Sequence, residues 1–313
     1  MTYKAQVNDP LPFTGERFTP ESVREIWYEH WHRYALAARY ADGRRVLDAA
    51  CGEGYGSALL ARHAKEVVGV DISDEAVTHA RARYVAPNLR FERADVTALT
   101  DLPDASFDLI VSFETIEHVA AQEALVAGFA RLLAPGGLLL ISSPDKRTYS
   151  EVQGFANEFH VRELYREELE ALLAPHFPAR ATLGQKLLFQ SVAWPLEGGA
   201  TRVAADTLRA DGSLVATLDY APVYFIVACA REAGHLPPFG LLSLFGDSAE
   251  SVYSHYNGEV RRNMQAGTLL ADMERRLAEA EARAAAAELR ATATAQPPPT
   301  DNLLARIKRW FSN

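Results

Sequence analysis

The stretch that most constrains this chain is a glycine-rich turn that directly follows an apolar strand. Residues 46–56 read Val-Leu-Asp-Ala-Ala-Cys-Gly-Glu-Gly-Tyr-Gly, and the run at 57–62 predicts a helix. Gly52, Gly54 and Gly56 have no Cβ, so the backbone can turn sharply there and let a ligand approach closely. A strand, a glycine turn and a helix at the start of an α/β sheet predict a nucleotide-binding corner.

The glycine spacing and the neighbouring charges indicate which nucleotide fits this corner. The dinucleotide fingerprint is G-x-G-x-x-G and places a pyrophosphate on the helix N-terminus, whereas the spacing here is G-x-G-x-G. Asp48 and Glu53 flank the turn and would repel a pyrophosphate. They favour a ligand that has no phosphate and carries positive charge, such as S-adenosylmethionine (SAM). A dinucleotide-dependent dehydrogenase is correspondingly disfavoured.

The same stretch resembles motif I of class I SAM-dependent methyltransferases, in which D-x-A-C-G-x-G-x-G is a common form. The resemblance extends over about residues 13–190. It implies an α/β, Rossmann-like fold with a seven-stranded class I methyltransferase sheet and an N-terminal lid helix, and the residue pattern after position 250 adds a C-terminal helical tail. It also implies SAM as methyl donor and S-adenosylhomocysteine (SAH) as product. The predicted cofactor-binding residues are Asp48, Cys51, Gly52, Gly54, Asp71, Ile72, Asp95, Val96 and Glu114.

Three acidic residues in this set follow predicted strands. Asp71 ends the strand at 66–70, where a carboxylate can accept hydrogen bonds from both ribose hydroxyls. The resemblance implies that Asp95 binds the adenine amino group while Val96 packs on the ring; a solvated turn carboxylate is the alternative. Glu114 follows the strand at 107–112, at the sheet edge where ligands bind in open α/β folds.

Two histidines are the candidate general bases for an acceptor hydroxyl. His118 follows the strand at 107–112, and His160 lies in a polar loop after the strand at 138–143. A histidine in either place can take a proton from a hydroxyl, or it can simply order its loop. The sequence shows no compact spacing of metal ligands, so we expect chemistry without a metal.

Two further segments suggest an acceptor. The N-x-F-H-V-R-E run at 157–163 and the G-E-R-F-x-P-E run at 15–21 resemble methyltransferases of bacterial polysaccharide and O-antigen clusters. This resemblance predicts O-methylation of a sugar hydroxyl on a bacterial surface glycan or its precursor. One alternative is a methyltransferase for a quinone or another small metabolite. Another is a scaffold module with the SAM fold in a glycan-synthesis complex.

The chain is predicted to divide into five parts. The helix at 21–40 is rich in aromatic residues and histidine, which fits either a lid over the ligand or a helix packed on the core. Arg17, His32 and Arg33 are the candidates there for binding the methionine carboxylate of SAM. The parts are an arm and lid helix (1–40), a methyltransferase domain (41–232), a linker (233–249), a helical tail (250–295) and a basic amphipathic helix (300–313).

The tail carries two patterns that suggest partners. Leu270, Met273 and Leu277 begin an alanine-rich a/d seam, which predicts either a weak coiled coil in a homodimer or a lone solvated helix. The helix at 303–311 combines Trp, Phe and basic residues. Such a helix can lie on an anionic membrane surface, dock on a partner such as a glycosyltransferase, or pack on its own domain.

Composition limits the remaining function classes. The formal net charge of −9 argues against binding of nucleic acid. The chain has only Cys51 and Cys229, so we expect no disulfide framework. With no signal-like N-terminus and no run long enough to cross a bilayer, we expect a cytoplasmic protein, with the terminal helix as the means of peripheral contact at the inner membrane face.

The remaining expectations concern the sheet. The last strand, at 223–229, is expected to pair antiparallel at the sheet edge. The strand before it is expected at 181–191 with an internal turn, followed by an irregular insertion at 195–213. The other strands are expected at 45–49, 66–70, 89–92, 107–112 and 138–143, with helices at 57–62, 75–82, 120–133 and 164–173.

Overall fold

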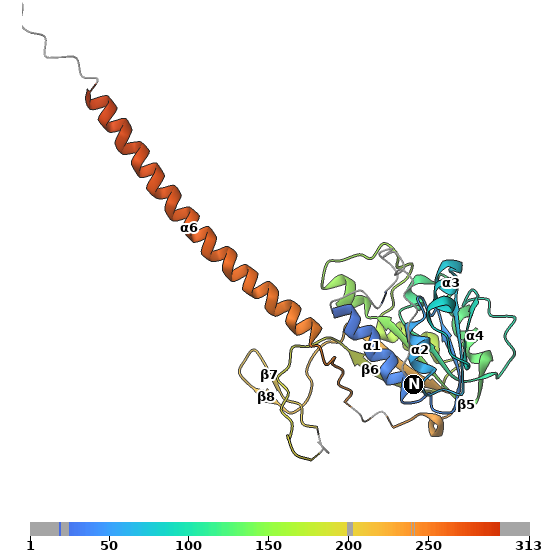
Figure 1. The fold of residues 1–313 in the computed structure, drawn as a ribbon. Coiled ribbons are helices and arrows are strands. Elements are labelled where there is room, and N and C mark those ends of the chain that lie inside the picture. The colour runs from blue at the N-terminus through green and yellow to red at the C-terminus, as the bar shows by residue number, and fades with distance from the viewer. Residues whose placement is uncertain (1–18, 20–24, 199–202, 239, 241, 295–313) are drawn as a thin grey trace, which may run out of the picture. The chain divides into compact units, whose positions relative to one another are not determined.

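A computed structural model describes residues 19, 25–198, 203–238, 240 and 242–294. The chain separates into two compact units, residues 1–250 and residues 251–313. The first unit is an α/β domain, and the described part of the second is one long helix (Figure 1). The predicted lid arm before residue 19 and the predicted basic helix at 300–313 lie outside the described residues.

The first unit is built on a seven-stranded sheet with the order β3-β2-β1-β4-β5-β9-β6. Strands β1 to β5 run parallel, and β9 is antiparallel to both of its neighbours, β5 and β6. This order confirms the predicted Rossmann-like methyltransferase fold. The strands are β1 (Arg45–Ala49), β2 (Glu66–Asp71), β3 (Leu89–Arg93), β4 (Phe107–Ser112), β5 (Leu133–Pro144), β6 (Ala179–Gln185) and β9 (Tyr224–Ala230).

Helices cover the sheet because its strands are apolar on both faces. Helices α1 (Glu25–Ala38) and α2 (Tyr55–Leu60) bury residues in one hydrophobic cluster. Helices α4 (Gln122–Leu132) and α5 (Arg166–Leu173) bury theirs in another. Helix α3 (Asp74–Arg83) packs on β2 and β3. Its N-cap is Ser73, whose hydroxyl accepts a hydrogen bond from the Ala76 amide.

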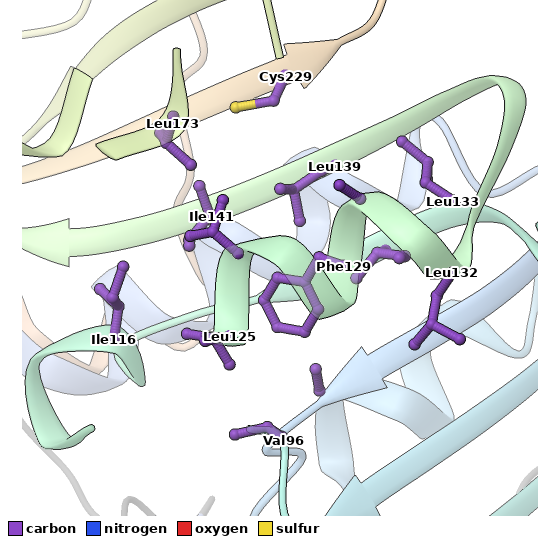
Figure 2. Packing of buried hydrophobic residues seen from close by; sticks show 14 of the residues in the cluster. Val96, Ile116, Leu125, Phe129, Leu132, Leu133, Leu139, Ile141, Leu173 and Cys229 are labelled. Carbon is purple, nitrogen blue, oxygen red and sulfur yellow. The ribbon is translucent and has the colours of Figure 1, made fainter. Parts of the chain in front are cut away.

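The larger cluster lies between the sheet and α4. Figure 2 shows Leu125 and Phe129 of α4 packed toward Leu139 and Ile141 of β5. All four side chains are fully buried. Burying a side chain of this size stabilises the fold by about 1.5–3 kcal/mol relative to leaving it in water. This packing fixes the carboxyl ends of β4 and β5, which carry the candidate site.

The structure corrects the predicted sheet edge. The antiparallel strand β9 lies between β5 and β6, so β6 forms the edge. Strand β6 ends at Gln185, which pairs with the first residue of β9, Tyr224. The apolar run at 187–191 is not a strand, because β9 offers no partner beyond that point. The predicted irregular insertion contains a short strand, β7 (Thr207–Leu208), which pairs with β8 (Leu214–Val215). The predicted polar loop at 144–163 contains a π-helical turn, η2 (Arg147–Glu151).

The segment that was predicted to be a linker packs against α1. The His32 Nε2 atom lies 2.9 Å from the Ser243 hydroxyl. The ring of Phe245 stacks on His32, with centroids 5.6 Å apart, and also contacts Trp27. Ser243 and Phe245 therefore pack on the first unit, since aromatic side chains on α1 give this part of the segment a surface to pack on.

The second unit contains α6 (Ser251–Thr294), which confirms the predicted tail helix. Its 44 residues span about 66 Å at 1.5 Å per residue. The side chains of Leu270, Met273 and Leu277 are all more than half exposed. Pairing of this seam with a second chain stays a prediction. Among the described helices, none combines the length and the apolar character that crossing a membrane requires.

Gly54 is expected to tolerate no side chain. Its φ is +93°, and a Cβ there would lie 2.8 Å from the Ala80 Cβ and 2.9 Å from the Phe91 ring. Gly54→Ala should lose about 1–2 kcal/mol to the left-handed backbone and about 1–3 kcal/mol more to the overlap. Gly43→Ala is the matched control, because Gly43 has a φ of +66° but open space around it. Urea denaturation should show a clearly larger loss for Gly54→Ala, and equal losses would contradict this packing.

Candidate active site

The candidate site lies at the carboxyl edge of the parallel strands, around the turn that follows β1. Ala50, Gly52 and Gly54 all have left-handed backbones, with φ values of 63°, 54° and 93°. The Cys51 amide donates a hydrogen bond to the Val70 carbonyl, 2.8 Å away, which ties the turn to β2. Because Ala50 pays a steric cost for a positive φ, the turn is held by its surroundings rather than by local preference.

Asp71 braces this turn from the end of β2. One carboxylate oxygen accepts a hydrogen bond from the Gly52 amide at 2.9 Å, and the other accepts one from the Ser73 amide at 2.9 Å. A carboxylate oxygen has two lone pairs, so each oxygen can accept a further hydrogen bond. Asp71 therefore places a partly satisfied carboxylate beside the glycine turn.

The two carboxylates that flank the turn are already engaged within the protein. Asp48 is fully buried and accepts hydrogen bonds from the hydroxyls of Tyr34 (3.0 Å) and Ser57 (2.5 Å). Burial raises the pKa of Asp48 to about 7. Glu53 is buried against His79 and Arg83, at 2.9 and 2.8 Å. Neither group presents a free negative charge at the turn, so this part of the sequence argument against a pyrophosphate does not hold.

The other predicted cofactor residues differ in what they present. Cys51 is buried in a cluster with Val77, Ala80 and Phe91, so its side chain is a packing group. The Ile72 side chain is 64% exposed beside Asp71.

Asp95 and Val96 follow β3. Asp95 is exposed, and one of its oxygens accepts hydrogen bonds from the amide and hydroxyl of Thr97, as in a turn-forming aspartate. Val96 belongs to the hydrophobic core, where Figure 2 shows it below α4. The Val96 side chain therefore has little surface left to offer a ligand.

Glu114 has a strained backbone conformation, and Ser142 holds it in place. Its φ is +50°, in the left-handed region that non-glycine residues rarely adopt. The Ser142 hydroxyl accepts a hydrogen bond from the Glu114 amide at 3.0 Å and donates one to the Glu114 carboxylate at 2.6 Å. Strain that is held by the surroundings in this way is typical of functional sites.

Arg33 brings a buried positive charge from α1 to the same place. Its side chain is 1% exposed, its Nε donates to the Gln185 side chain at 2.8 Å, and one terminal nitrogen lies 3.5 Å from the Glu114 carboxylate. The guanidinium also lies over the Tyr224 ring, 4.5 Å from its centroid. Within the described residues, its two terminal nitrogens have no hydrogen-bond acceptor. A buried guanidinium with unused donors indicates a site for an anionic group.

His118 and Glu117 lie just beyond Glu114 in the turn η1 (Ile116–His118). The His118 Nδ1 atom lies 3.0 Å from the Phe159 carbonyl, which can only accept, so Nδ1 carries the proton and Nε2 is the basic nitrogen. Glu117 is buried, and one of its carboxyl oxygens lacks a hydrogen-bond partner among the described residues. Burial and the nearby Glu114 charge hold the pKa of Glu117 well above its usual range.

His160 meets His118 across the site. Their rings are perpendicular, with centroids 4.9 Å apart. The His160 Nδ1 atom donates to Glu163 at 2.6 Å, and its Nε2 accepts from the Asn157 amide at 3.0 Å. Both ring nitrogens of His160 are therefore engaged, and the basic Nε2 of His118 lies 4.0 Å from a Glu117 carboxyl oxygen.

The fold also creates a cluster that the sequence did not predict. Ligand atoms of Glu117, His118 and His160 all lie within 4.8 Å of one another. These are the described side chains that could hold a divalent cation, which is at odds with the expected lack of a metal site. Sequence spacing missed the cluster because His160 reaches it from a distant loop. It also missed Ser142 and Tyr224, since serines and tyrosines in strands carry no local signal.

Ser142→Ala should destabilise the fold by about 1–3 kcal/mol, because it leaves the Glu114 amide without its acceptor. The control is Ser143→Ala, whose equally buried hydroxyl only donates to the Pro144 carbonyl at 3.2 Å. Its loss should be about 0.5–1.5 kcal/mol. Chemical denaturation of both variants checks this difference. A loss at Ser142 no larger than at Ser143 would show that Glu114 does not depend on Ser142.

Comparisons with known proteins agree with this geometry. Residues 47–141 match the model of a methyltransferase domain family. A probable S-adenosylmethionine-dependent methyltransferase of Mycolicibacterium smegmatis is 41% identical over 56% of this chain and 68% of its own length. A protein of the same description from Mycobacterium tuberculosis is 41% identical over 52% of this chain and 60% of its own length.

Two further proteins are less similar to this chain. A ubiquinone biosynthesis O-methyltransferase of Rhizobium etli is 33% identical over 49% of this chain and 63% of its own length. A solved structure from Pyrococcus horikoshii is 20% identical, covers 66% of this chain and 92% of that chain, and has a TM-score of 0.48. The match to the Mycolicibacterium protein covers more than two thirds of that relative. The chain therefore belongs to the S-adenosylmethionine-dependent methyltransferases, enzymes that use SAM and release SAH.

Proposed function

We propose that this methyltransferase transfers the methyl group of SAM to a hydroxyl oxygen of a small-molecule acceptor. The observation that carries this proposal is the placement of His118. Its Nδ1 is anchored on the Phe159 carbonyl, and its basic Nε2 lies 4.0 Å from a Glu117 carboxyl oxygen, in the turn that follows the carboxyl end of β4. A base is useful there because a hydroxyl is a weak nucleophile near neutral pH.

The residues around the turn fit the parts of SAM. Asp71 has spare lone pairs for the ribose hydroxyls, and the exposed Ile72 beside it can cover the adenine ring. Arg33 offers unused donors to the methionine carboxylate, and the Glu114 carboxylate beside it suits the ammonium group. We assign the adenine edge to Asp95 and the backbone of Val96. Gly52 and Gly54 let the ligand approach the backbone, while Asp48 and Cys51 support the turn from below.

SAM supplies a methyl group on a sulfonium, which is a good leaving group. This chain therefore has to align the acceptor and remove its proton. As the oxygen–carbon bond forms and the sulfur–carbon bond breaks, the hydroxyl proton passes to the His118 Nε2 and the bonding pair stays on sulfur. His160 and Tyr149, whose rings stack 5.4 Å apart, form the wall beside this base.

For the acceptor, we propose an aromatic or quinone-type hydroxyl. The named ubiquinone O-methyltransferase among the relatives supports this choice over a sugar hydroxyl. The relatives reported above give no support to the predicted resemblance to polysaccharide and O-antigen methyltransferases. The scaffold alternative has no support either, since the relatives reported above are named as methyltransferases.

Asp71→Ala is expected to abolish SAM binding. The change removes the proposed ribose ligand and also the acceptor for the Gly52 amide. Isothermal titration of SAM into the variant should show at least about a hundredfold weaker binding, because two charge-assisted hydrogen bonds are lost. Asp74→Ala, at an exposed carboxylate three residues further on, should bind SAM like the unaltered protein. Retained affinity in Asp71→Ala would refute the cofactor assignment.

The two histidines should separate in rate. At saturating SAM, His118→Ala is expected to slow methyl transfer by about 10²–10⁴-fold, the usual contribution of a general base. His160→Ala should slow it less, because His160 acts through its contact with His118. His235→Ala, at an exposed histidine, is the control. The measurement is transfer of labelled methyl to one acceptor preparation. If both site variants keep the full rate, neither histidine is the base.

A further inference from the structure

We propose that a cavity beside α1 holds the body of the acceptor, and that Glu29 anchors the acceptor there by accepting a hydrogen bond from one of its hydroxyl groups. The acceptor class that this cavity fits is a hydroxylated ring attached to a largely apolar body. This inference rests on the function proposed above and extends it, because neither the sequence nor the relatives assign a role to Glu29 or to the cavity.

The cavity is about 470 Å³ in volume and lies where five parts of the first unit meet. Its walls come from α1, from Arg166 of α5, from the end of β6 with the chain that follows it, from residues 218–225 and from residues 242–245. A volume of this size suits a small organic molecule. The run at 187–188, which the sequence predicted as strand, instead forms one of these walls.

The lining is mixed. Its apolar side chains include Leu187, Leu188, Leu218, Leu242, Leu244 and Phe245, and its polar ones include Glu29, His32, Arg166, Thr182, Lys186, Gln190 and Ser243. A sugar has a polar group on nearly every carbon, and those that face the leucines would be left unpaired, at a cost in desolvation. A ring with an alkyl or prenyl-like body would instead bury apolar surface there.

Glu29 connects this cavity to the methyl-transfer site. It lines the cavity, and it interacts with Arg33, Glu114 and Tyr224, which are the groups proposed to surround the methionine end of SAM. The Tyr224 ring lies 5.9 Å from that of Tyr149, which in turn stacks on His160. Side-chain contacts therefore connect Glu29, through Tyr224 and Tyr149, to the two histidines.

The ionisation of Glu29 gives the proposal a pH dependence. Burial raises the pKa of Glu29 to about 7, against the opposing effects of Arg33, Tyr224 and the Leu187 amide; the Glu114 charge raises it further. The other ionisable groups of the cavity are Tyr28, His32, Arg166, Lys186 and Tyr220. Above about pH 7 the Glu29 carboxylate is charged and accepts a stronger hydrogen bond. Acceptor binding through Glu29 should therefore tighten as the pH rises from 6 to 8.

The test compares two probes that share an alkyl tail. In the presence of SAH, 4-hexylcatechol and hexyl glucoside are titrated into the full chain, and binding is followed by calorimetry at pH 6 and pH 8. We expect 4-hexylcatechol to bind at least about tenfold more tightly than the glucoside, which corresponds to one or two extra unpaired polar groups in the weaker ligand. Its affinity should rise with pH as the Glu29 carboxyl becomes charged. The phenol itself stays protonated in this range and does not contribute to the change.

Two variants and a control locate the site. Glu29→Gln should weaken catechol binding about tenfold at pH 8 and make it independent of pH. Leu187→Trp should weaken it at both pH values by filling the cavity. Val85→Trp is the control, because Val85 lines a separate cavity of about 230 Å³ near α3 and β3. Leu187→Trp and Val85→Trp should bind SAM normally, which shows that they fold, and circular dichroism checks the fold of Glu29→Gln.

Each outcome bears on the proposal. Equal binding of both probes, tighter binding of the glucoside, or catechol binding that is unchanged in both Glu29→Gln and Leu187→Trp would overturn it. In those cases intact SAM binding and methyl transfer would leave the proposed function standing. Loss of SAM binding in the unaltered protein would instead count against the proposed function itself.

Discussion

The structure of the site depends on the buried guanidinium of Arg33. This one side chain connects α1 to Gln185 at the end of β6, to Glu114 at the end of β4 and to the ring of Tyr224 in β9. Burial alone would lower the pKa of Arg33, but the Glu114, Tyr224 and Glu29 groups more than offset that effect and keep it charged. A charge held this way needs its partners in place, since an unpaired buried charge is strongly destabilising. The helix, the sheet edge and the acidic groups therefore form one unit.

A second constraint is the backbone strain around the ligand edge. Ala50 and Glu114 both have positive φ values, and each follows directly after a central strand of the sheet. Their neighbours hold them there: Asp71 fixes the turn after β1, and Ser142 fixes Glu114. The packed core beneath α4 makes the strand ends rigid enough to support this strain (Figure 2). Fold stability and ligand geometry thus depend on the same strand ends.

Features with a local pattern could be predicted from the sequence. The glycine turn, the parallel strands, Asp71 at the end of β2 and the Ser73 cap each have a signal within a few residues. Features that join distant segments could not. Arg33 meets Gln185 across 152 positions, and the wall that includes Leu187 depends on where the sheet happens to end. The sequence also overstated the repulsion of a pyrophosphate by Asp48 and Glu53. The side chains that engage these carboxylates lie on helices α1, α2 and α3.

The central claim is that SAM is used here to methylate a ring hydroxyl on an apolar body. The most direct measurement is transfer of labelled methyl from SAM into host extract, followed by separation into lipid-soluble small molecules, saccharides and protein. The account predicts label in the lipid-soluble fraction, in a compound that contains a methoxylated aromatic ring. Label in the saccharide fraction would contradict it and favour a glycan acceptor. No label in any fraction, from protein that binds SAM, would contradict methyl transfer to a small molecule altogether.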